Sequence, residues 1–386
     1  MYHNTVFSDL VKPINRGDFG RLVRAHGSDR YSKSFKSWQH LMSMLYCHFS
    51  GASSLREAEV MYGSHVGGRY HLSLPSLKRS TLSQANNKRS PDLFRDVACG
   101  LLGQCRKLNE AGSLLRLLDS SPIVVKGRGN QWTKETCCAR IEGLKLHLGF
   151  EPKEEAIDYV DITPAKVNDI TAIASLTLEA GKVYVFDKGY CDYNWWKAIV
   201  DKGSVFVTRL KKNAAYRVVE SHAITEADRD FILKDQTIEL TNGRPRGGKT
   251  NTLVGVRLRK IEVAREGKAP LVIVSNDLVE APAIVAGDYK TRWQIELLFK
   301  WLKRYLHVKT FLGETQNSIK IQLYTAIIAY CLLWLRRKTT QSPQQSLAHL
   351  CSIVQTTLLV RPETERCRKI KHEINQLTSP QLQMIL

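Results

Sequence analysis

Acidic side chains are the scarce charge in this sequence. The 386 residues include 37 Asp and Glu against 57 Lys and Arg, so the formal net charge is +20. So large a basic excess suits a polyanionic partner, and nucleic acid is the commonest one. Apolar residues still make up 43% of the chain, which is enough for a core and excludes disorder along its whole length. The length predicts two or three domains, or one large domain with an insertion.

The nine cysteines contain no C-x-x-C pair, and their number is odd. We interpret them as reduced, mostly buried thiols of a cytoplasmic protein, and we expect no zinc site. The most apolar run, Ile321–Leu335, contains Gln322 and is shorter than the roughly 20 residues that span a bilayer, so it predicts a buried core helix. The N-terminus lacks an apolar segment after basic residues, so no secretory signal is expected.

Apolar spacing predicts helices first and strands later. Helical spacing marks Phe35–Phe49 and Leu93–Leu108, and we interpret this basic leading part as a DNA-binding region, with an ordinary solvated surface as the alternative. Predicted strands and helices then alternate, which indicates a mixed sheet flanked by helices. The predicted strands are Ser113–Leu118 with Ile123–Val125, Gly143–Phe150, Ala156–Thr163, Val183–Phe186 and Ser204–Thr208; the predicted helices are Asp169–Ala180 and Tyr193–Asp201.

The remaining segments predict a β-rich insertion followed by long helices. Strands are predicted at Thr237–Leu240, Leu253–Val263 and Leu271–Ser275, and helices at Ala286–Val308 and Ser318–Lys338. We therefore expect five parts: a helical basic region at 1–110, the first part of an α/β core at 111–208, the insertion at 209–286, the second part of the core at 287–345 and a helical tail at 346–386.

Asp119 and Asp187 occupy similar positions in the sequence pattern. Each follows a short apolar segment and is predicted to end a strand and begin a turn. Carboxylates at the ends of neighbouring strands can converge and share a divalent cation. An Asp after a strand is also a common turn former, so this placement alone leaves both interpretations open.

The predicted helix around Glu296 presents an unusual polar face. At 100° per residue, four polar residues lie within about 60° of one another: Tyr289, Arg292, Glu296 and Lys303. A carboxylate among a phenol, a guanidinium and an ammonium suits a metal-bound carboxylate beside donors to a phosphate. An amphipathic helix with i,i+4 ion pairing is the alternative.

The spacing Tyr289-x2-Arg292-x3-Glu296-x6-Lys303 resembles the Y-R-E-K signature of the insertion-sequence-four family of DDE transposases. Two further segments resemble the same family: Leu117-Leu118-Asp119-Ser120 at the first Asp, and Val185-Phe186-Asp187-Lys188-Gly189-Tyr190 at the second. The stretch between Asp187 and Glu296 leaves room for the β-rich insertion that separates these residues in the family. The resemblance covers residues 113–340.

The resemblance implies an α/β fold with a ribonuclease-H-like mixed sheet. It implies that Asp119, Asp187 and Glu296 are the catalytic ligands of two Mg²⁺ ions, for which Mn²⁺ substitutes, and that Tyr289, Arg292 and Lys303 contact DNA phosphates. It further implies cut-and-paste transposition: hydrolysis at the element's ends, hairpin formation and joining to target DNA. The implied partners are the terminal inverted repeats, the target DNA and a second copy of the chain, in the bacterial cytoplasm.

Two other functions stay open from the sequence. One is a metal-dependent DNA nuclease or integrase without hairpin chemistry, and the other is a transposase-derived DNA-binding protein that no longer cuts. The presence of all three carboxylates argues against the second.

Several other residues are of types that can take part in binding or catalysis. An aromatic side chain could hold a base unstacked in a hairpin, and the candidates are Trp132, Trp195, Trp196 and Trp293, although core packing is the commoner role. Gly243–Thr250 fits the Walker A pattern, but a strand is predicted after it where a phosphate-binding loop needs a helix. ATP binding is therefore not expected, and we interpret this segment as a hairpin tip that could contact DNA. His147 is expected to be structural, and no chemistry is assigned to Cys137–Cys138.

Overall fold

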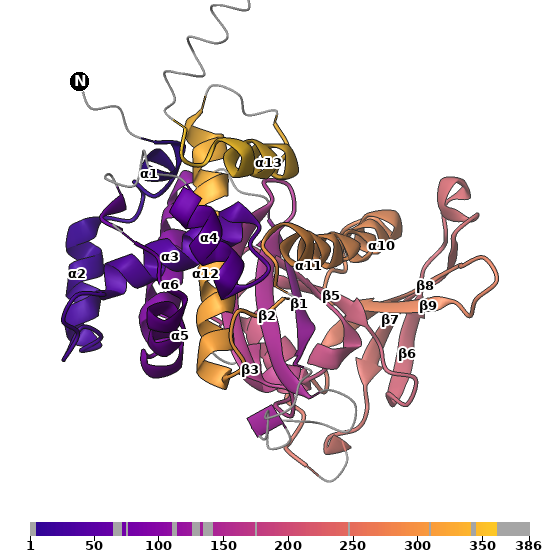
Figure 1. Cartoon of the computed structure of the whole chain (residues 1–386). Helices are drawn as coiled ribbons and strands as arrows, with labels where there is room; N and C mark the ends of the chain where they lie inside the picture. Colours follow the sequence, from indigo (N-terminus) through magenta and orange to yellow (C-terminus); the bar gives the residue numbers. More distant parts are fainter. Residues whose placement is uncertain are drawn as a thin grey trace, which may run out of the picture. The chain divides into compact units, whose positions relative to one another are not determined.

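The computed structural model describes residues 5–64, 72–74, 76–109, 114–125, 132–133, 142–173, 176–245, 248–308, 310–340 and 345–360. Contacts divide the chain into two compact units (Figure 1). One, the helical unit, contains the residues up to Cys105 and those from Trp301 onward, and the other, the sheet unit, is Arg106–Lys300. Cys137–Cys138 and the tail beyond residue 360 lie outside the described residues.

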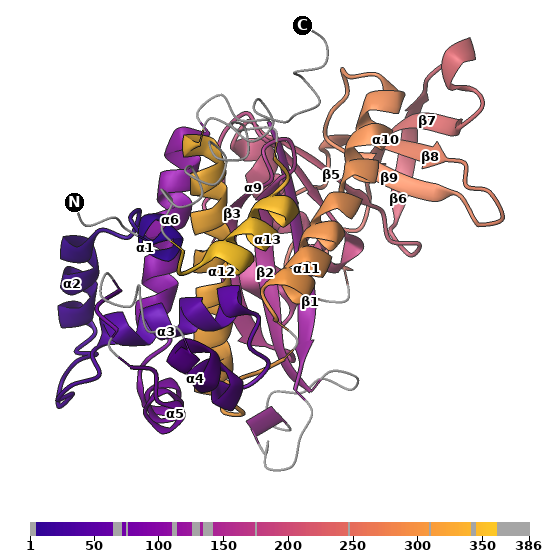
Figure 2. The same cartoon turned by 45° about the horizontal axis from the view of Figure 1, so that its top comes forward.

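The helical unit is organised around one long apolar helix. Its helices, labelled in Figure 2, are α1 (Val6–Leu10), α2 (Arg16–Ala25), α3 (Ser37–Ser50), α4 (Leu55–Ser64), α5 (Arg79–Lys88), α6 (Asp92–Leu108), α12 (Gln316–Thr339) and α13 (Leu347–Thr357). The longest, α12, is apolar on all sides and packs against α1, α3, α5 and α13. Its length and composition would suffice to cross a bilayer, but 94% of its most apolar stretch is buried within the protein. The prediction of a core helix at Ile321–Leu335 is confirmed.

Side-chain caps fix where several helices begin. The Thr315 hydroxyl accepts a hydrogen bond from the Ser318 N–H at the start of α12, and the Ser346 hydroxyl accepts one from the His349 N–H at the start of α13. Asn15 caps α2 in the same way. Each cap satisfies a backbone donor that has no partner within the helix.

The sheet unit is built on a mixed sheet whose nine described strands run in the order β3-β2-β1-β4-β5-β9-β8-β7-β6. The strands are β1 (Leu115–Val124), β2 (Gly143–Glu151), β3 (Ala156–Pro164), β4 (Val183–Phe186), β5 (Val205–Arg209), β6 (Tyr216–Ser221), β7 (Ile232–Leu240), β8 (Arg257–Val263) and β9 (Leu271–Ser275). β1, β4 and β5 are parallel, whereas β2 and β3 join by antiparallel pairing. This is the ribonuclease-H-like arrangement, and the predicted α/β fold class is confirmed.

The strands β6 to β9 continue the same sheet. β9 pairs with β5, and the series continues antiparallel through β8 and β7 to β6, whose residues are all exposed. Figure 1 shows β6, β7 and β8 at the end of the sheet away from β3. The β-rich segment is therefore an extension of the sheet, joined to it through main-chain hydrogen bonds.

The alternation of side chains separates packing from chemistry across the sheet. Helix α9 (Tyr193–Asp201) covers one face, where Trp196 is fully buried beside Phe206, with ring centroids 4.9 Å apart. Leu118 and Phe186 belong to the same core. Because successive residues of a strand point to opposite faces, Asp119 lies on the face opposite to Leu118. Helix α10 (Pro282–Thr291), which contacts β4 and β5, supplies partners to that second face.

Two predicted elements differ in extent. The helix predicted at Asp169–Ala180 is wrong beyond its first turn: α8 covers only Asp169–Ala172, and Leu176 and Leu178 pack on the core instead. The strand predicted at Leu253–Val263 begins later, at Arg257, because fully buried Leu253 lies in a turn closed by the Val256 N–H. In both cases the packing of leucines outweighed the local propensity.

A buried histidine makes the helical unit sensitive to acid. His48 donates from Nδ1 to the Leu306 carbonyl (2.9 Å), and its Nε2 lies 2.9 Å from the Thr325 hydroxyl. Burial lowers the pKa of His48 from 6.5 to about 4. As the pH falls, His48 is therefore protonated in the unfolded chain before it is protonated in the folded one. The unfolding free energy that His48 contributes above pH 6.5 is lost as the pH falls toward 4.

We predict that His48→Gln lowers the melting temperature at neutral pH. The variant should also lose less stability between pH 6.5 and 4, because protonation of His48 lowers the unfolding free energy of the wild type by on the order of 3 kcal/mol over this range. Thermal unfolding followed by circular dichroism across this pH range measures the effect. The control, His349→Gln, changes an exposed histidine and should leave the pH profile parallel to the wild type. A profile of His48→Gln that also runs parallel would contradict the assignment.

Candidate active site

Asp119 lies inside a strand, so the prediction that it ends one is wrong. β1 continues through Asp119 to Val124 because its antiparallel pairing with β2 persists, with Asp119 opposite Leu148. The parallel pairing of β1 with β4, however, stops one residue earlier, at Leu118 opposite Phe186. Asp187 directly follows β4. Both carboxylates therefore stand at the carboxyl end of the β1–β4 pair, as the strand-end argument expected.

The helix predicted at Ala286–Val308 is interrupted. α10 ends at Thr291, α11 (Trp293–Tyr305) begins two residues later, and Arg292 forms the junction. Here the Arg292 N–H donates to the Tyr289 carbonyl and the Ile295 N–H donates to the Arg292 carbonyl, both over three residues and 3.2 Å. This tighter turn replaces α-helical bonding at the junction, so a uniform 100° projection does not describe the polar face.

Arg292 joins two of the predicted catalytic carboxylates. Its Nη1 donates to Asp119 Oδ2 at 3.0 Å and its Nη2 donates to Glu296 Oε1 at 2.7 Å. The guanidinium is 17% exposed and its Nε has no hydrogen-bond partner among the described residues. The forked geometry of arginine allows two nitrogens of one side chain each to donate to a different carboxylate.

Asp187 is tied to the same group through Tyr289. The Tyr289 hydroxyl donates to Asp187 Oδ1 at 3.3 Å, and the Tyr289 ring lies 6.0 Å from the Arg292 guanidinium. Arg209, at the end of β5, places its Nη1 3.9 Å from the same Asp187 oxygen. The structure thus brings together Asp119, Asp187, Glu296, Tyr289 and Arg292, and adds Arg209, which the sequence analysis did not assign to the site.

Lys303 is the predicted site residue that belongs to the other compact unit. It lies in the last turn of α11, seven residues after Glu296, and falls within the helical unit. Its contact with DNA stays a prediction.

Electrostatics at the site favour the binding of cations. Burial, opposed by the Ser120 N–H and Arg292 and reinforced by Asp187 and Glu296, raises the pKa of Asp119 to about 6. Burial and the charge of Asp187 raise the pKa of Tyr289 to about 12, so its hydroxyl stays protonated and donates. A half-buried carboxylate with two acidic neighbours is stabilised by any cation that approaches it, and Arg292 now provides that charge.

The chemistry of these side chains fits a hard divalent cation. The three carboxylates offer only oxygen donors, the type that Mg²⁺ and Mn²⁺ prefer. Within the part of the chain that the structure describes, no three Asp, Glu, His or Cys side chains yet enclose a metal-sized space. One oxygen each of Asp119 and Glu296 is held by Arg292, which leaves the second oxygen of each carboxylate outside these hydrogen bonds.

A second polar group supports β1 beside Asp119. The Ser120 hydroxyl donates to Asp169 Oδ1 at 3.2 Å, and Lys145 Nζ donates to the same oxygen at 3.0 Å. Lys145 also donates to the Val167 carbonyl at 3.0 Å. The sequence analysis assigned neither Lys145 nor Asp169 to the site, because nothing in the local pattern distinguishes Asp169 from an ordinary acidic residue at the start of a helix.

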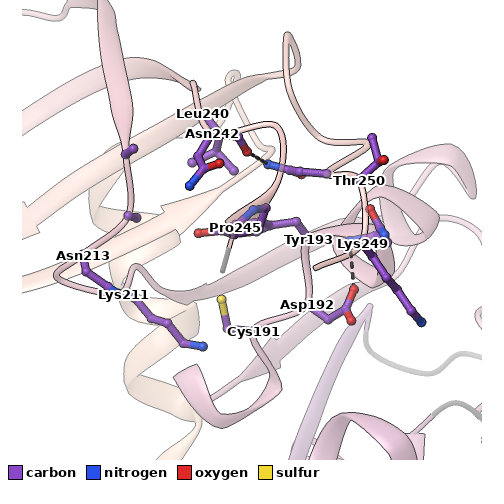
Figure 3. Close-up of a pocket in the computed structure, with 14 residues that line it drawn as sticks. Cys191, Asp192, Tyr193, Lys211, Asn213, Leu240, Asn242, Pro245, Lys249 and Thr250 are labelled. Atoms are coloured by element: carbon purple, nitrogen blue, oxygen red, sulfur yellow. Dashed lines mark hydrogen bonds between the residues drawn. The ribbon is translucent and has the colours of Figure 1, made fainter. Parts of the chain in front are cut away.

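The Walker-like segment lines a hollow instead of opening a helix. Among its described residues, Pro245, Lys249 and Thr250 border a cavity of about 340 Å³. Figure 3 shows Lys211 beside Cys191, with Lys249 on the other side of the view near Thr250. A turn and β8 follow, not a helix, so the phosphate-binding geometry of a nucleotide loop is missing. The first residue along the chain that lines the cavity, Cys191, lies four residues after Asp187. Contact between the Walker-like segment and DNA stays a prediction.

The histidine and tryptophan residues considered above differ in how deeply they are buried. His147 is buried and its Nε2 lies 2.8 Å from the Thr163 hydroxyl, a structural setting. Trp196 is fully buried and Trp195 packs on Phe186 with ring centroids 4.8 Å apart. Trp293, next to Arg292, is 56% exposed.

Comparison with known proteins identifies the class. The family model described as the transposase DDE domain matches residues 110–332, and a second, described as a domain of unknown function (DUF4372), matches residues 2–74. A protein of Sinorhizobium fredii named as transposase y4zB is 36% identical over 274 residues, covering 69% of this chain and 74% of that protein. A Geobacillus stearothermophilus protein named as the transposase of insertion sequence element IS5377 is 27% identical over 355 residues, covering 90% and 89%.

Among solved structures, a cryo-EM structure of the piggyBac transposase synaptic complex with hairpin DNA aligns with a TM-score of 0.43 and 10% identity, over 91% of this chain and 78% of that one. The family match covers more than half of the present chain and includes both Asp residues and the Glu. The chain belongs to the DDE transposases. It is therefore a metal-dependent enzyme of DNA phosphoryl transfer, and the family predicted from its motifs is confirmed.

We predict that Arg292→Gln lowers the unfolding free energy by about 1–3 kcal/mol near neutral pH, because two carboxylates lose a charged donor. Folding already disfavours the charged form of Asp119, so its contribution to stability declines as pH rises from 3.8 through about 6. The loss caused by the substitution should therefore shrink below pH 5, where Asp119 is protonated. Calorimetry of the wild type and the variant near neutral pH and below pH 5 measures the change in unfolding free energy at each pH.

The matched control is Arg209→Gln, since Arg209 stands 3.9 Å from a carboxylate and both partners are about one-third exposed. Such a pair contributes little, so its removal should change stability by less than about 1 kcal/mol. An equal loss for Arg292→Gln at both pH values would show that the guanidinium does not compensate the charge of Asp119.

Proposed function

We propose that this chain catalyses cut-and-paste transposition of an element of the insertion-sequence-four type, with Asp119, Asp187 and Glu296 as its catalytic metal ligands. The observation that carries the proposal is a pair of neighbouring contacts: Arg292 binds Asp119 and Glu296, and Tyr289, whose ring lies 6.0 Å from the Arg292 guanidinium, binds Asp187. These five residues come from three distant segments and match both Asp motifs and most of the Y-R-E-K spacing. An amphipathic surface helix would not require that convergence.

The proposed metal ligands would hold two Mg²⁺ ions, which supply activation of the attacking oxygen and stabilisation of the leaving oxygen. Asp119 provides a half-buried ligand whose position is fixed, because its main chain pairs with Leu148 on β2 and its Oδ1 accepts the Ser120 N–H at 2.8 Å. Glu296 and Asp187 are about one-third exposed, so they face the side from which DNA arrives.

Arg292 and Tyr289 would exchange partners when the site is loaded. Release of Asp119 and Glu296 frees two guanidinium donors, and these can bind a DNA phosphate near the scissile bond in the same forked manner. The Tyr289 hydroxyl, a donor at all relevant pH values, can bind a second phosphate oxygen. Lys303 would add a further phosphate contact, and Arg209 would keep its charge beside Asp187.

Hairpin formation is the finer part of the proposal. Hydrolysis would first free a 3′-hydroxyl, which attacks the opposite strand, and later the opened end joins target DNA. The required bend unstacks a base, and we propose Trp293 as the residue that holds it, because this ring is exposed and adjoins Arg292. Trp196 is excluded from this role by its burial in the core.

The remaining parts of the proposal concern assembly. Residues 1–110 would bind DNA, residues 111–208 and 287–345 would form the catalytic core around the insertion at 209–286, and the tail would follow from 346. A homodimer would hold both terminal inverted repeats and the target DNA in the bacterial cytoplasm. The named relatives are encoded by bacteria, which supports this setting.

We predict that Asp119→Asn, Asp187→Asn and Glu296→Gln each abolish Mg²⁺-dependent cleavage of the element's own ends while retaining DNA binding. Each change keeps the shape of the side chain and removes the charge that a divalent ion needs. Cleavage is followed on a denaturing gel, which also resolves hairpin ends. Asp201→Asn at the exposed end of α9 is the control and should cut normally. Full cleavage by any one of the three variants would remove that residue from the metal site.

We predict that Trp293→Ala reduces hairpin products at least about tenfold, consistent with stacking worth about 1–3 kcal/mol per base, while first-strand nicking continues. Trp293→Phe keeps a ring and should retain part of the hairpin yield. Quantifying nicked and hairpin species in one gel lane separates the two steps. Equal loss of both species in Trp293→Ala would argue for a general structural role, and complete absence of hairpins from the wild type would favour the nuclease or integrase alternative.

A further inference from the structure

The helical unit contains a groove that the catalytic chemistry does not use. Its volume is about 760 Å³. One wall is the connection between α2 and α3, residues 26–35, and the other is one face of α5 with the two residues after it. The α5 residues on this wall are spaced as i, i+3, i+4 and i+7 along the helix: Thr81, Gln84, Ala85 and Lys88. The first wall lies inside the matched domain of unknown function and the second lies beyond it.

The groove is positively charged. Four permanent cations line it: Arg30, Lys33, Lys88 and Arg89. The described residues that line it include no Asp or Glu; the nearby Asp29 accepts hydrogen bonds from the Ser37 N–H and hydroxyl, and its Oδ1 also lies 3.8 Å from Arg89 Nη2. His26 is paired with Asp96, 2.7 Å away. A solvated surface of this chain mixes both signs of charge, so a groove lined by one sign is selective for anions.

Two buried polar atoms of the groove lack a partner. Arg89 is 8% exposed, and its Nη2 is held by the Phe35 carbonyl and the Ser32 hydroxyl, whereas its Nη1 has no hydrogen-bond partner among the residues that the structure describes. The Ser28 hydroxyl is likewise buried without one. Buried donors are almost always satisfied in folded proteins, so two orphans in one cationic groove point to a ligand that accepts hydrogen bonds.

The rim of the groove carries a strained aromatic residue. Tyr31 has a φ of 62°, a left-handed conformation that bulky residues rarely adopt, although its side chain is 89% exposed. Core packing therefore does not explain its position. The Arg30 guanidinium lies 5.1 Å from its ring, so the strained turn presents a cation and a phenol together at the mouth. Such strain is concentrated at binding and catalytic sites.

We propose that this groove binds the phosphate backbone of duplex DNA. A phosphate oxygen would accept hydrogen bonds from Arg89 Nη1 and the Ser28 hydroxyl, while Lys33 and Lys88 neutralise the flanking phosphates and Tyr31 contacts the sugar-phosphate edge. DNA is the occupant because the chain is a DNA transposase; the proposal thus deepens the DNA-binding role assigned above to residues 1–110. It gives the matched domain of unknown function a binding surface.

The test is fluorescence anisotropy with the full-length protein and a labelled duplex of arbitrary sequence, in EDTA so that no cleavage occurs. The double variant Lys33→Glu/Lys88→Glu changes only exposed side chains. We expect its affinity to fall by at least about tenfold and the slope of log affinity against log salt to decrease by about two, one for each lost phosphate contact. Tyr31→Ala should weaken binding further than Tyr31→Phe.

The control is the single variant Arg56→Glu, in which Lys33 and Lys88 are intact. It reverses an exposed positive charge on α4, outside the groove, so its slope of log affinity against log salt should differ from the wild-type slope by less than about one-half. Melting temperatures check that every variant is folded. Wild-type affinity and slope in the double variant would overturn the proposal. No cleavage occurs in EDTA, so this binding assay tests the groove alone; the cleavage assay with Mg²⁺ tests the catalytic assignment separately.

Discussion

The proposed catalytic group depends on one electrostatic constraint: three carboxylates gathered near one face of a sheet need cations beside them. In the structure Arg292 meets this need with a forked pair of hydrogen bonds to Asp119 and Glu296. Burial raises the pKa of Asp119 to about 6, and the charge of Arg292 opposes that rise. The arginine therefore favours the charged form of Asp119, which is the form that binds a metal ion.

The sheet makes this gathering compatible with a stable core. Leu118 and Phe186 face the α9 side, and the residues that follow them in sequence, Asp119 and Asp187, face or adjoin the opposite side. A shift of β1 by one residue relative to β4 would bury the carboxylate in the aromatic core and expose the leucine. The burial of Leu118 and Phe186 in the same core therefore favours the register that positions Asp119 on the opposite face.

The sequence was sufficient for those features that depend on spacing along the chain. Val183–Phe186 and Tyr193–Asp201 were predicted with the bounds that β4 and α9 have, because apolar periodicity and flanking Gly or Asp marked both ends. The Y-R-E-K spacing marked Tyr289, Arg292 and Glu296 as one face. It could not reveal the break at Arg292, which depends on three-residue hydrogen bonding, or the position of Asp119 within a longer strand, which depends on pairing with β2.

Residues brought together only by tertiary structure were beyond such reasoning. Arg209 and Asp187 are separated by a helix, and the groove at residues 26–35 needs α5 as its second wall. No local pattern distinguishes Arg89 from the other basic residues of the first part of the chain. Its single unpartnered nitrogen becomes visible only when the contacts of the folded chain are counted.

A transposase also faces a conflict between catalysis and affinity. Carboxylates suited to hold metal ions repel the phosphates of the substrate, so the active site alone supplies little binding energy before the ions are in place. Affinity must then come from cations elsewhere in the chain, and the excess of 57 basic over 37 acidic residues provides them. A groove lined by four cations and no carboxylate is the arrangement that this conflict requires. Its phosphate contacts are independent of sequence, so they can hold both an element's end and any target.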